Sequence, residues 1–105
     1  MSDFVSVAAI NTMTEGRLFS FNVNGRRVAV AKVGDQFFAV DDLCTHDDGP
    51  LGEGLVEGCE VECPRHGARF DLKTGAAIRM PAVVGVKVHA TRVTNGHLEI
   101  QITGQ

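Results

Sequence analysis

Two short motifs hold the residues of this sequence that are best suited to binding a metal: Cys44-Thr45-His46 and Cys63-Pro64-Arg65-His66. Each motif offers one thiolate and one imidazole, which are soft and borderline ligands suited to iron–sulfur clusters or to zinc. The spacing within each motif allows both side chains to lie on one side of a tight loop, and Gly49 and Gly67 let the backbone bend close behind. The sequence therefore predicts a four-ligand metal site built from two loops.

The third cysteine, Cys59, is expected to be neither a ligand nor part of a disulfide. Three cysteines is an odd number, which argues against a disulfide framework. Cys59 and Cys63 belong to a segment of extended character, which would place them roughly 13 Å apart and beyond disulfide reach. A free thiol in the strand-like run Gly58–Glu62 usually behaves as a small hydrophobic side chain.

The elements that must position these loops are short β-strands. Leu18–Val23 and Arg26–Val33 flank Asn24-Gly25, which is a strong two-residue hairpin signal. Gly34-Asp35 then turns the chain into a further strand over Gln36–Val40. No window shows a convincing helical period, so an antiparallel barrel or sandwich is expected.

Strands are also predicted near the end of the chain. Apolar and other residues alternate from Val84 to His89, which is the pattern of a half-buried strand. A second Asn-Gly pair, Asn95-Gly96, leads into Leu98, Ile100 and Ile102, which alternate with polar neighbours. His89 and His97 fall on the polar phases of these segments, so both are expected at the surface; Phe37, Phe38 and Phe70 are expected in the core.

The middle of the chain, residues 41–81, has a different character. It is rich in glycine and proline, and all three cysteines and two of the four histidines lie inside it. Loops this dense in turn residues are usually either disordered or organised around a bound group. We interpret residues 41–81 as a cluster-binding insertion in the β-scaffold, and residues 1–105 as a single domain.

Composition sets further limits on function. A chain of 105 residues with 44% hydrophobic and 22% charged residues has the composition of an ordinary soluble globular protein. No stretch reaches the roughly 18 apolar residues that a membrane span needs, and the N-terminus has no signal-peptide pattern. We therefore expect a cytoplasmic protein with no membrane or nucleic-acid partner.

The net charge of −3 conceals an uneven distribution. The segment from residue 41 to residue 62 contains eight acidic residues and no lysine or arginine, whereas the rest of the chain has a net charge of +5. A solvated acidic face is the simpler interpretation. Because the segment brackets the first metal-binding motif, it could also dock a basic partner, with Asp47, Asp48 and Glu53 contributing to electrostatic steering.

The combined pattern resembles the Rieske ferredoxins. Gly49-Pro50-Leu51 follows the first motif, and the second motif continues as His66-Gly67-Ala68-Arg69-Phe70-Asp71. The later Thr74-Gly75 turn and Pro81 also match the family, and the flanking hairpins are similar to the Rieske basal β-domain, so the resemblance spans the whole chain. It implies a small all-β fold, one Rieske-type [2Fe–2S] cluster and one-electron transfer.

The resemblance also implies a ligand assignment. Cys44 and Cys63 would bind the inner iron, and His46 and His66 would bind the outer iron. Because the imidazoles are neutral, such a cluster carries less negative charge than one held by four cysteines, which makes reduction easier and raises the reduction potential. The imidazoles also place protonatable nitrogens at the tip of the site, where proton uptake can couple to reduction.

Departures from the respiratory Rieske proteins indicate a lower potential within the family. Those proteins carry an additional cysteine in each loop, joined in a disulfide, whereas the matching positions here are Gly49 and Arg65. They also place a serine after the His-Gly pair and a tyrosine nearby, whereas this chain has Ala68 and no tyrosine. Fewer hydrogen-bond donors to the cluster mean a more reducing site. The role of Arg65, facing a partner or opposing the acidic first loop, stays open.

The function implied by the resemblance is that of a ferredoxin in a multicomponent aromatic-ring dioxygenase system. It would accept electrons from a flavin-containing ferredoxin reductase and pass them singly to a terminal oxygenase that docks at the cluster tip. No substrate pocket can be argued from the sequence, so the chain is expected to be an electron-transfer component and not an enzyme. A monomer is expected by default.

Three alternatives remain at this point. The chain could be the small Rieske subunit of an assimilatory nitrite reductase, or a ferredoxin that serves another oxidoreductase. A rival of a different class is a zinc-stabilised interaction module, because two cysteines and two histidines can also hold structural zinc. Isolated zinc sites usually draw on paired Cys-x₂₋₄-Cys or His-x₃₋₅-His spacings, which favours the cluster.

Overall fold

The computed structural model describes residues 3–43, 51, 54–63, 67–80 and 84–103. Within these ranges the regular secondary structure is β-strand apart from one 3-10 helix, η1 (Ile10–Thr12), which confirms the predicted all-β class. Among the described residues no helix has the length and apolar character needed to cross a membrane. The strands in chain order are β1 (Val5–Ala9), β2 (Leu18–Val23), β3 (Arg26–Val33), β4 (Gln36–Asp41), β5 (Leu55–Glu57), β6 (Glu60–Glu62), β7 (Arg69–Asp71), β8 (Ala77–Arg79), β9 (Val88–Thr94) and β10 (His97–Gln101).

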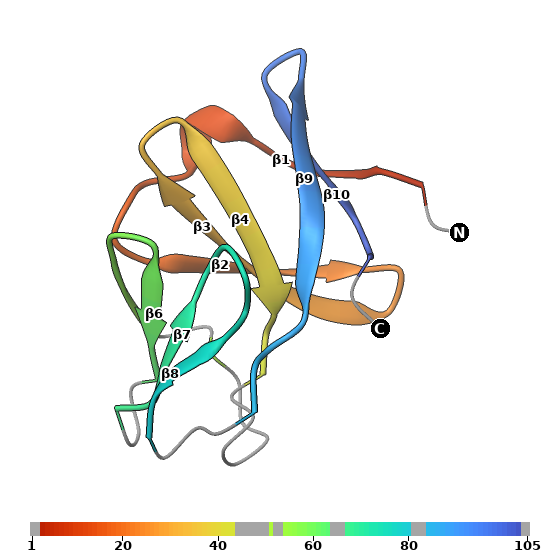
Figure 1. The fold of residues 1–105 in the computed structure, drawn as a ribbon. Helices are drawn as coiled ribbons and strands as arrows, with labels where there is room; N and C mark the ends of the chain where they lie inside the picture. The colour runs from red at the N-terminus through yellow and green to blue at the C-terminus, as the bar shows by residue number, and fades with distance from the viewer. Residues whose placement is uncertain (1–2, 44–50, 52–53, 64–66, 81–83, 104–105) are drawn as a thin grey trace.

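Six strands form a curved antiparallel sheet in the order β1-β10-β9-β4-β3-β2. The strands at the two ends of this order, β1 and β2, contact each other, so the sheet curls into a nearly closed barrel (Figure 1). The β2–β3 and β9–β10 hairpins turn at the two Asn-Gly pairs, where Asn24 has a φ of 53° and Asn95 a φ of 52°. Asparagine and glycine tolerate the positive φ that such two-residue turns require, and both predicted hairpins are confirmed.

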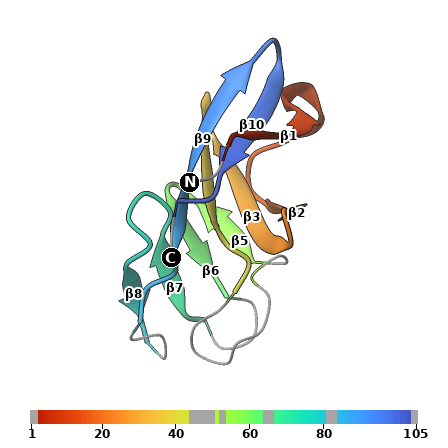
Figure 2. The same cartoon turned by 90° about the vertical axis from the view of Figure 1, so that its right-hand side faces the viewer.

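Four short strands form a second antiparallel sheet in the order β5-β6-β7-β8. This sheet falls inside the predicted 41–81 insertion, and it lies at the end of the molecule opposite the β9–β10 hairpin (Figures 1 and 2). Two backbone contacts join it to the barrel: an isolated antiparallel bridge between Arg17 and Leu55, and a 3.4 Å hydrogen bond from the Val56 N–H to the Gly16 carbonyl. The small sheet therefore packs on the barrel as a subdomain.

Two apolar clusters hold the fold together. One fills the barrel and includes Val28, Leu98 and Ile100, all fully buried. The other joins the barrel to the small sheet, with contributions such as Leu18 from β2 and Phe70 from β7. Burying such side chains stabilises a fold by roughly 1.5–3 kcal/mol each, so the second cluster is what fixes the small sheet against the barrel. Of the phenylalanines predicted in the core, Phe37 and Phe70 are buried and Phe38 is half-buried.

The turn between β7 and β8 lies directly against the segment that leads into β9. The Val86 N–H donates a 2.8 Å hydrogen bond to the Gly75 carbonyl. A Cβ on Gly75 would lie 2.0 Å from the Val86 carbonyl oxygen, and one on Gly85 would lie 2.6 Å from the Gly75 carbonyl oxygen. The backbones therefore meet at a distance that only glycine permits at these two positions.

This contact explains where the predicted strands were wrong. The valine alternation predicted a strand from Val84, but the structure is irregular from Val84 to Lys87 and β9 begins only at Val88. The backbone of the irregular segment bonds to Gly75 and, through Lys87, to the end of β4 instead of continuing the β9 ladder. The alternation over Leu98, Ile100 and Ile102 also predicted a strand that reaches Ile102. In the structure β10 ends at Gln101, so Ile102 lies outside it.

Candidate metal centre

Of the four predicted ligands, the structure describes Cys63; Cys44, His46 and His66 lie outside the described residues. Cys63 directly follows β6, and its exposed fraction is 0%. Its N–H donates a 2.7 Å hydrogen bond to the Ala68 carbonyl, and its own carbonyl accepts a 3.1 Å hydrogen bond from the Gly67 N–H. These bonds join Cys63 to Gly67 and Ala68, the described residues on the two sides of 64–66.

Leu51 anchors the chain that follows the first motif. It is fully buried in the same apolar cluster as Cys63, Ala68 and Phe70, and its carbonyl accepts a 2.7 Å hydrogen bond from the Gly54 N–H. The sequence argument used Leu51 only as part of a resemblance and missed this physical role. A signal was present, because Leu51 is the sole large apolar residue between Cys44 and Leu55.

The second motif is continued by residues that build the β7–β8 turn. Phe70 is fully buried beside Cys63 in the shared apolar cluster. The Asp71 side chain accepts hydrogen bonds at its Oδ1 from the N–H groups of Lys73 (2.7 Å) and Thr74 (3.2 Å). Its carbonyl also accepts a 2.7 Å hydrogen bond from the Gly75 N–H. The Phe-Asp pair therefore fixes the chain next to the second motif through packing and through a side-chain-capped turn.

Two consecutive arginines at the start of β3 pair with two consecutive aspartates at the end of the strand that precedes Cys44. Arg26 donates to Asp41 through its Nε (3.0 Å) and NH2 (2.9 Å) atoms. The Arg27 NH2 and the Ser20 hydroxyl donate to Asp42 Oδ2 at 3.1 Å and 3.0 Å. The Asp42 side chain has an exposed fraction of 0%. These pairs hold the chain that enters the first motif against β2 and β3.

Arg69 binds three carboxylates on the surface of the small sheet. It lies opposite Glu62 in the β6–β7 register and forms ion pairs with Glu62 (2.7 Å), with Glu60 (3.3 Å) and with Glu57. The hydrogen bond from Arg69 lowers the pKa of Glu57 below its ordinary value, and the three carboxylates raise the pKa of Arg69. The guanidinium therefore ties β5 and β6 to β7, just after the second motif.

These contacts change the interpretation of the acidic segment. The described acids in it are all paired with arginines of this chain: Asp41 with Arg26, Asp42 with Arg27, and Glu57, Glu60 and Glu62 with Arg69. With Arg79, which also pairs with Glu62, four arginines offset part of the negative charge of these five carboxylates. The three acids that the docking hypothesis named, Asp47, Asp48 and Glu53, lie outside the described residues.

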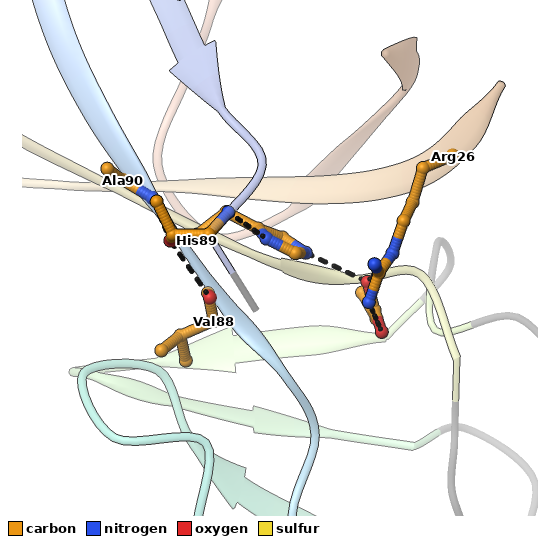
Figure 3. A network of polar contacts seen from close by, with 6 residues as sticks. Arg26, Val88, His89 and Ala90 are labelled. Atoms are coloured by element: carbon orange, nitrogen blue, oxygen red, sulfur yellow. Dashed lines mark hydrogen bonds and ion pairs between the residues drawn. The ribbon is translucent and has the colours of Figure 1, made fainter. Parts of the chain in front are cut away.

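His89 was expected at the surface, and this was wrong. Its side chain has an exposed fraction of 0%, and its Nε2 lies 2.8 Å from Asp41 Oδ1 (Figure 3). The polar phase of the sequence pattern gave no sign of this partner, which lies 48 residues away. His97, in contrast, is exposed as expected.

The surroundings of Cys63 are suited to one ligand of a metal cluster. Cys63 and Cys59 are both free of disulfides, and a thiol buried among apolar side chains offers a ligand shielded from water. Cys59 is half-buried in the turn between β5 and β6, not in a strand. Within the described ranges no three His, Cys, Asp or Glu side chains come together as a metal site, so no competing centre appears there.

A comparison with protein-family models matches residues 3–90 to the Rieske [2Fe-2S] domain. The chain belongs to this family. Its cofactor is therefore one Rieske-type [2Fe–2S] cluster, which overturns the zinc-stabilised module, and the donor set of two cysteines and two histidines is the one that Rieske centres use.

Individual relatives of this Rieske chain cover nearly its whole length. It is 33% identical over 93 residues to the ferredoxin component of the naphthalene 1,2-dioxygenase/salicylate 5-hydroxylase systems of Ralstonia sp, covering 89% of each chain. It superposes with a TM-score of 0.89 at 32% identity on the ferredoxin of carbazole 1,9a-dioxygenase from Nocardioides aromaticivorans IC177, covering 92% of this chain and 95% of that one. A chain in the complex of reduced oxygenase and oxidised ferredoxin of carbazole 1,9a-dioxygenase gives a TM-score of 0.90 at 34% identity, covering 97% and 95%.

Proposed function

We propose that this Rieske chain carries single electrons from a flavin-containing ferredoxin reductase to the terminal oxygenase of an aromatic-ring dioxygenase system. The observation that carries the proposal is the match, over nearly the full length of both chains, to a ferredoxin component of such a system. The solved complex of an oxygenase with a ferredoxin of the same fold supports the oxygenase as a direct partner. The names of these relatives favour a dioxygenase circuit over the nitrite reductase subunit. The chain is accordingly an electron carrier and not an enzyme.

We assign the cluster to Cys44, His46, Cys63 and His66 within a single domain spanning residues 1–105. When bound, the cluster supplies the capacity to accept and release one electron. The chain's own residues hold the ligands in place: Cys63 is buried at the end of β6 with its loop closed by Gly67 and Ala68. The same packing shields the Cys63 thiolate from water.

The surface at this end of the molecule supports docking of a partner there. Among the described residues, large exposed apolar side chains include Ile78, Met80 and Val84, which all lie on β8 or close to it and flank residues 81–83. Met80 is 75% exposed. Small apolar contacts of this kind suit a transient electron-transfer encounter, which needs fast release as well as fast association. We propose that the protein acts as a monomer in the cytoplasm, with Asp47, Asp48 and Glu53 steering the encounter.

A pair of cysteine variants tests the site. Cys63→Ser removes a proposed ligand, so we expect the purified variant to lose the red-brown colour and the bound iron and sulfide. Cys59→Ser is the matched control, because it removes a half-buried thiol four residues away that we do not assign to the cluster. Iron retained in Cys63→Ser, or lost equally in both variants, would refute the assignment.

The circuit is tested by reconstitution. The protein is mixed with the flavin-containing reductase and terminal oxygenase of a naphthalene 1,2-dioxygenase system, and reduction of each component is followed by stopped-flow absorbance. We expect reduction of the oxygenase to require this chain and to be abolished in Cys63→Ser. Oxygenase reduction that proceeds equally without the chain would contradict the proposal.

A further inference from the structure

His89 is the middle member of a polar network that crosses the barrel near its cluster-binding end (Figure 3). The Thr103 N–H donates a 3.2 Å hydrogen bond to His89 Nδ1, so Nδ1 is an acceptor and carries no proton. The ring proton is therefore on Nε2, which donates to Asp41 Oδ1 at 2.8 Å. His89 thus bridges Thr103 and Asp41 through its two ring nitrogens.

Asp41 forms hydrogen bonds with three different parts of the chain. Arg26, at the start of β3, donates to both of its carboxylate oxygens, and His89, in β9, donates to Oδ1. The backbone N–H of Asp41 donates a 2.9 Å hydrogen bond to the carbonyl of Lys87, in the irregular segment before β9. The Asp41 side chain is only 14% exposed, and hydrogen bonds to a charged group in such surroundings are among the stronger ones in proteins.

This network joins two pieces of chain that each lead into the cluster-binding end. Asp41 is the last residue of β4 and precedes the proposed ligand Cys44 by three positions. Lys87 and His89 belong to the chain that follows residues 81–83 and that rests on the β7–β8 turn through Val86. Asp41 therefore links the chain that enters the first motif to the chain that leads into β9.

Val40 of β4 and Val86 share one apolar cluster, but farther along the two pieces are not packed together. A groove of about 240 Å³ separates the two pieces, with Asp41 and Leu43 lining one side and residues 84–87 the other. Val84, on the groove, is exposed. The β4–β9 ladder ends at the Val40–Val88 pair, and beyond it the two pieces are connected at the base of the groove by the contacts of Asp41 with His89 and Lys87.

We infer that Asp41, clamped by Arg26 and His89, is a positioning residue for the cluster. It sets the distance between the chain entering the first motif and the chain entering β9, and so fixes the surroundings of the bound group. The inference rests on the proposed cluster site. It goes beyond that site because none of the three side chains is a ligand.

The histidine offers two informative variants. In His89→Gln the amide nitrogen can replace Nε2 and still donate to Asp41, whereas in His89→Asn the shorter side chain can replace only Nδ1 as the acceptor for Thr103. Asp41→Asn removes the carboxylate charge from the centre of the network. Glu99→Gln is the control, because it breaks an Arg92–Glu99 ion pair in the remote β9–β10 hairpin.

The readouts are the midpoint potential, the electron paramagnetic resonance spectrum of the reduced protein, and the rate of cluster loss to a chelator. We expect Asp41→Asn and His89→Asn to shift the potential and the spectrum and to lose the cluster roughly tenfold faster, as loss of a charge-assisted hydrogen bond implies. We expect His89→Gln and Glu99→Gln to match the wild type in all three.

Unfolding temperatures of the same proteins separate positioning from general stability. If Asp41→Asn and His89→Asn melt earlier but keep the potential, the spectrum and the rate of cluster loss of Glu99→Gln, the residues are structural only and the inference is overturned. It is equally overturned if His89→Gln behaves as His89→Asn does. Failure of the wild type to show a Rieske spectrum would instead refute the proposed function.

Discussion

Asp41 is a residue whose ionisation contributes to the stability of the folded protein. Burial raises its pKa, but the hydrogen bonds and charges of Arg26 and the hydrogen bond from His89 outweigh this effect, so its pKa lies below the ordinary value of 3.8. A carboxyl whose pKa is lower in the folded state stabilises the protein at pH values above its unfolded pKa. That stabilisation is lost as the pH falls through the folded pKa.

We therefore predict a pH-dependent effect of Asp41→Asn. At neutral pH the variant should lose about 2 kcal/mol of stability, because a hydrogen-bonded ion pair is broken. The difference in unfolding temperature from the wild type should be constant down to about pH 4 and should narrow below it. A gap that widens as the pH falls would contradict the assigned pKa direction.

At the scale of elements, the small sheet is held to the barrel by a close backbone approach at Gly75. Its φ is 80°, and a Cβ there would meet the Val86 carbonyl oxygen at 2.0 Å. Gly96, in the β9–β10 turn, has nearly the same φ, 76°, but open space around the position of a Cβ. Substitutions at the two glycines therefore distinguish the free-energy cost of a positive φ from the additional cost of a steric clash.

We predict different outcomes for alanine at these two positions. Gly96→Ala should destabilise the fold by about 1 kcal/mol, the usual cost of placing a non-glycine residue at positive φ. Gly75→Ala should cost more than about 3 kcal/mol or prevent folding, because the backbones must also separate. Unfolding in denaturant, monitored by circular dichroism, measures both. Equal effects of the two substitutions would show that the close approach of Gly75 to Val86 carries little free energy.

An element could be predicted from the sequence where neighbouring residues determine its conformation, and could not where contacts distant in sequence determine it. The hairpins at Asn24-Gly25 and Asn95-Gly96 were predictable because the turn residues themselves supply the required φ. The irregular segment 84–87 was not, because its conformation is set by contact with Gly75, in another turn. The burial of His89 was missed for the same reason, since its partner Asp41 is distant in sequence. In the metal centre, residue types and spacing indicated the ligands, whereas the anchoring by Leu51 and Arg69 depends on packing and register.

At the scale of the whole molecule, the two apolar clusters divide the fold into a part near the cofactor and a part remote from it. Cys63 and Leu51 belong to the cluster that joins the small sheet to the barrel. The barrel interior, with Leu98 and Ile100, forms its own cluster. Because metal binding is coupled to the folding of the segments that hold the ligands, removing the cofactor should affect these two parts unequally.

We predict that chelation of the iron loosens the small sheet first. Amide hydrogen exchange should accelerate in β5–β8 and around Leu51, while β10 keeps most of its protection, because Leu98 and Ile100 pack in the other apolar cluster. Exchange monitored by mass spectrometry, with and without the cluster, gives the comparison. Uniform loss of protection across both sheets would show that the fold is a single cooperative unit.

The most direct test of the central claim, a Rieske cluster that carries single electrons at low potential, is the midpoint potential measured by anaerobic voltammetry. Rieske centres span about −150 to +300 mV, whereas plant-type clusters with four cysteine ligands lie near about −400 mV. The account predicts a one-electron wave near the low end of the Rieske range, because Ala68 stands where a donor serine would be and the chain has no tyrosine. A wave near the high end, a wave near the four-cysteine value, or no wave from fully metallated protein would contradict it.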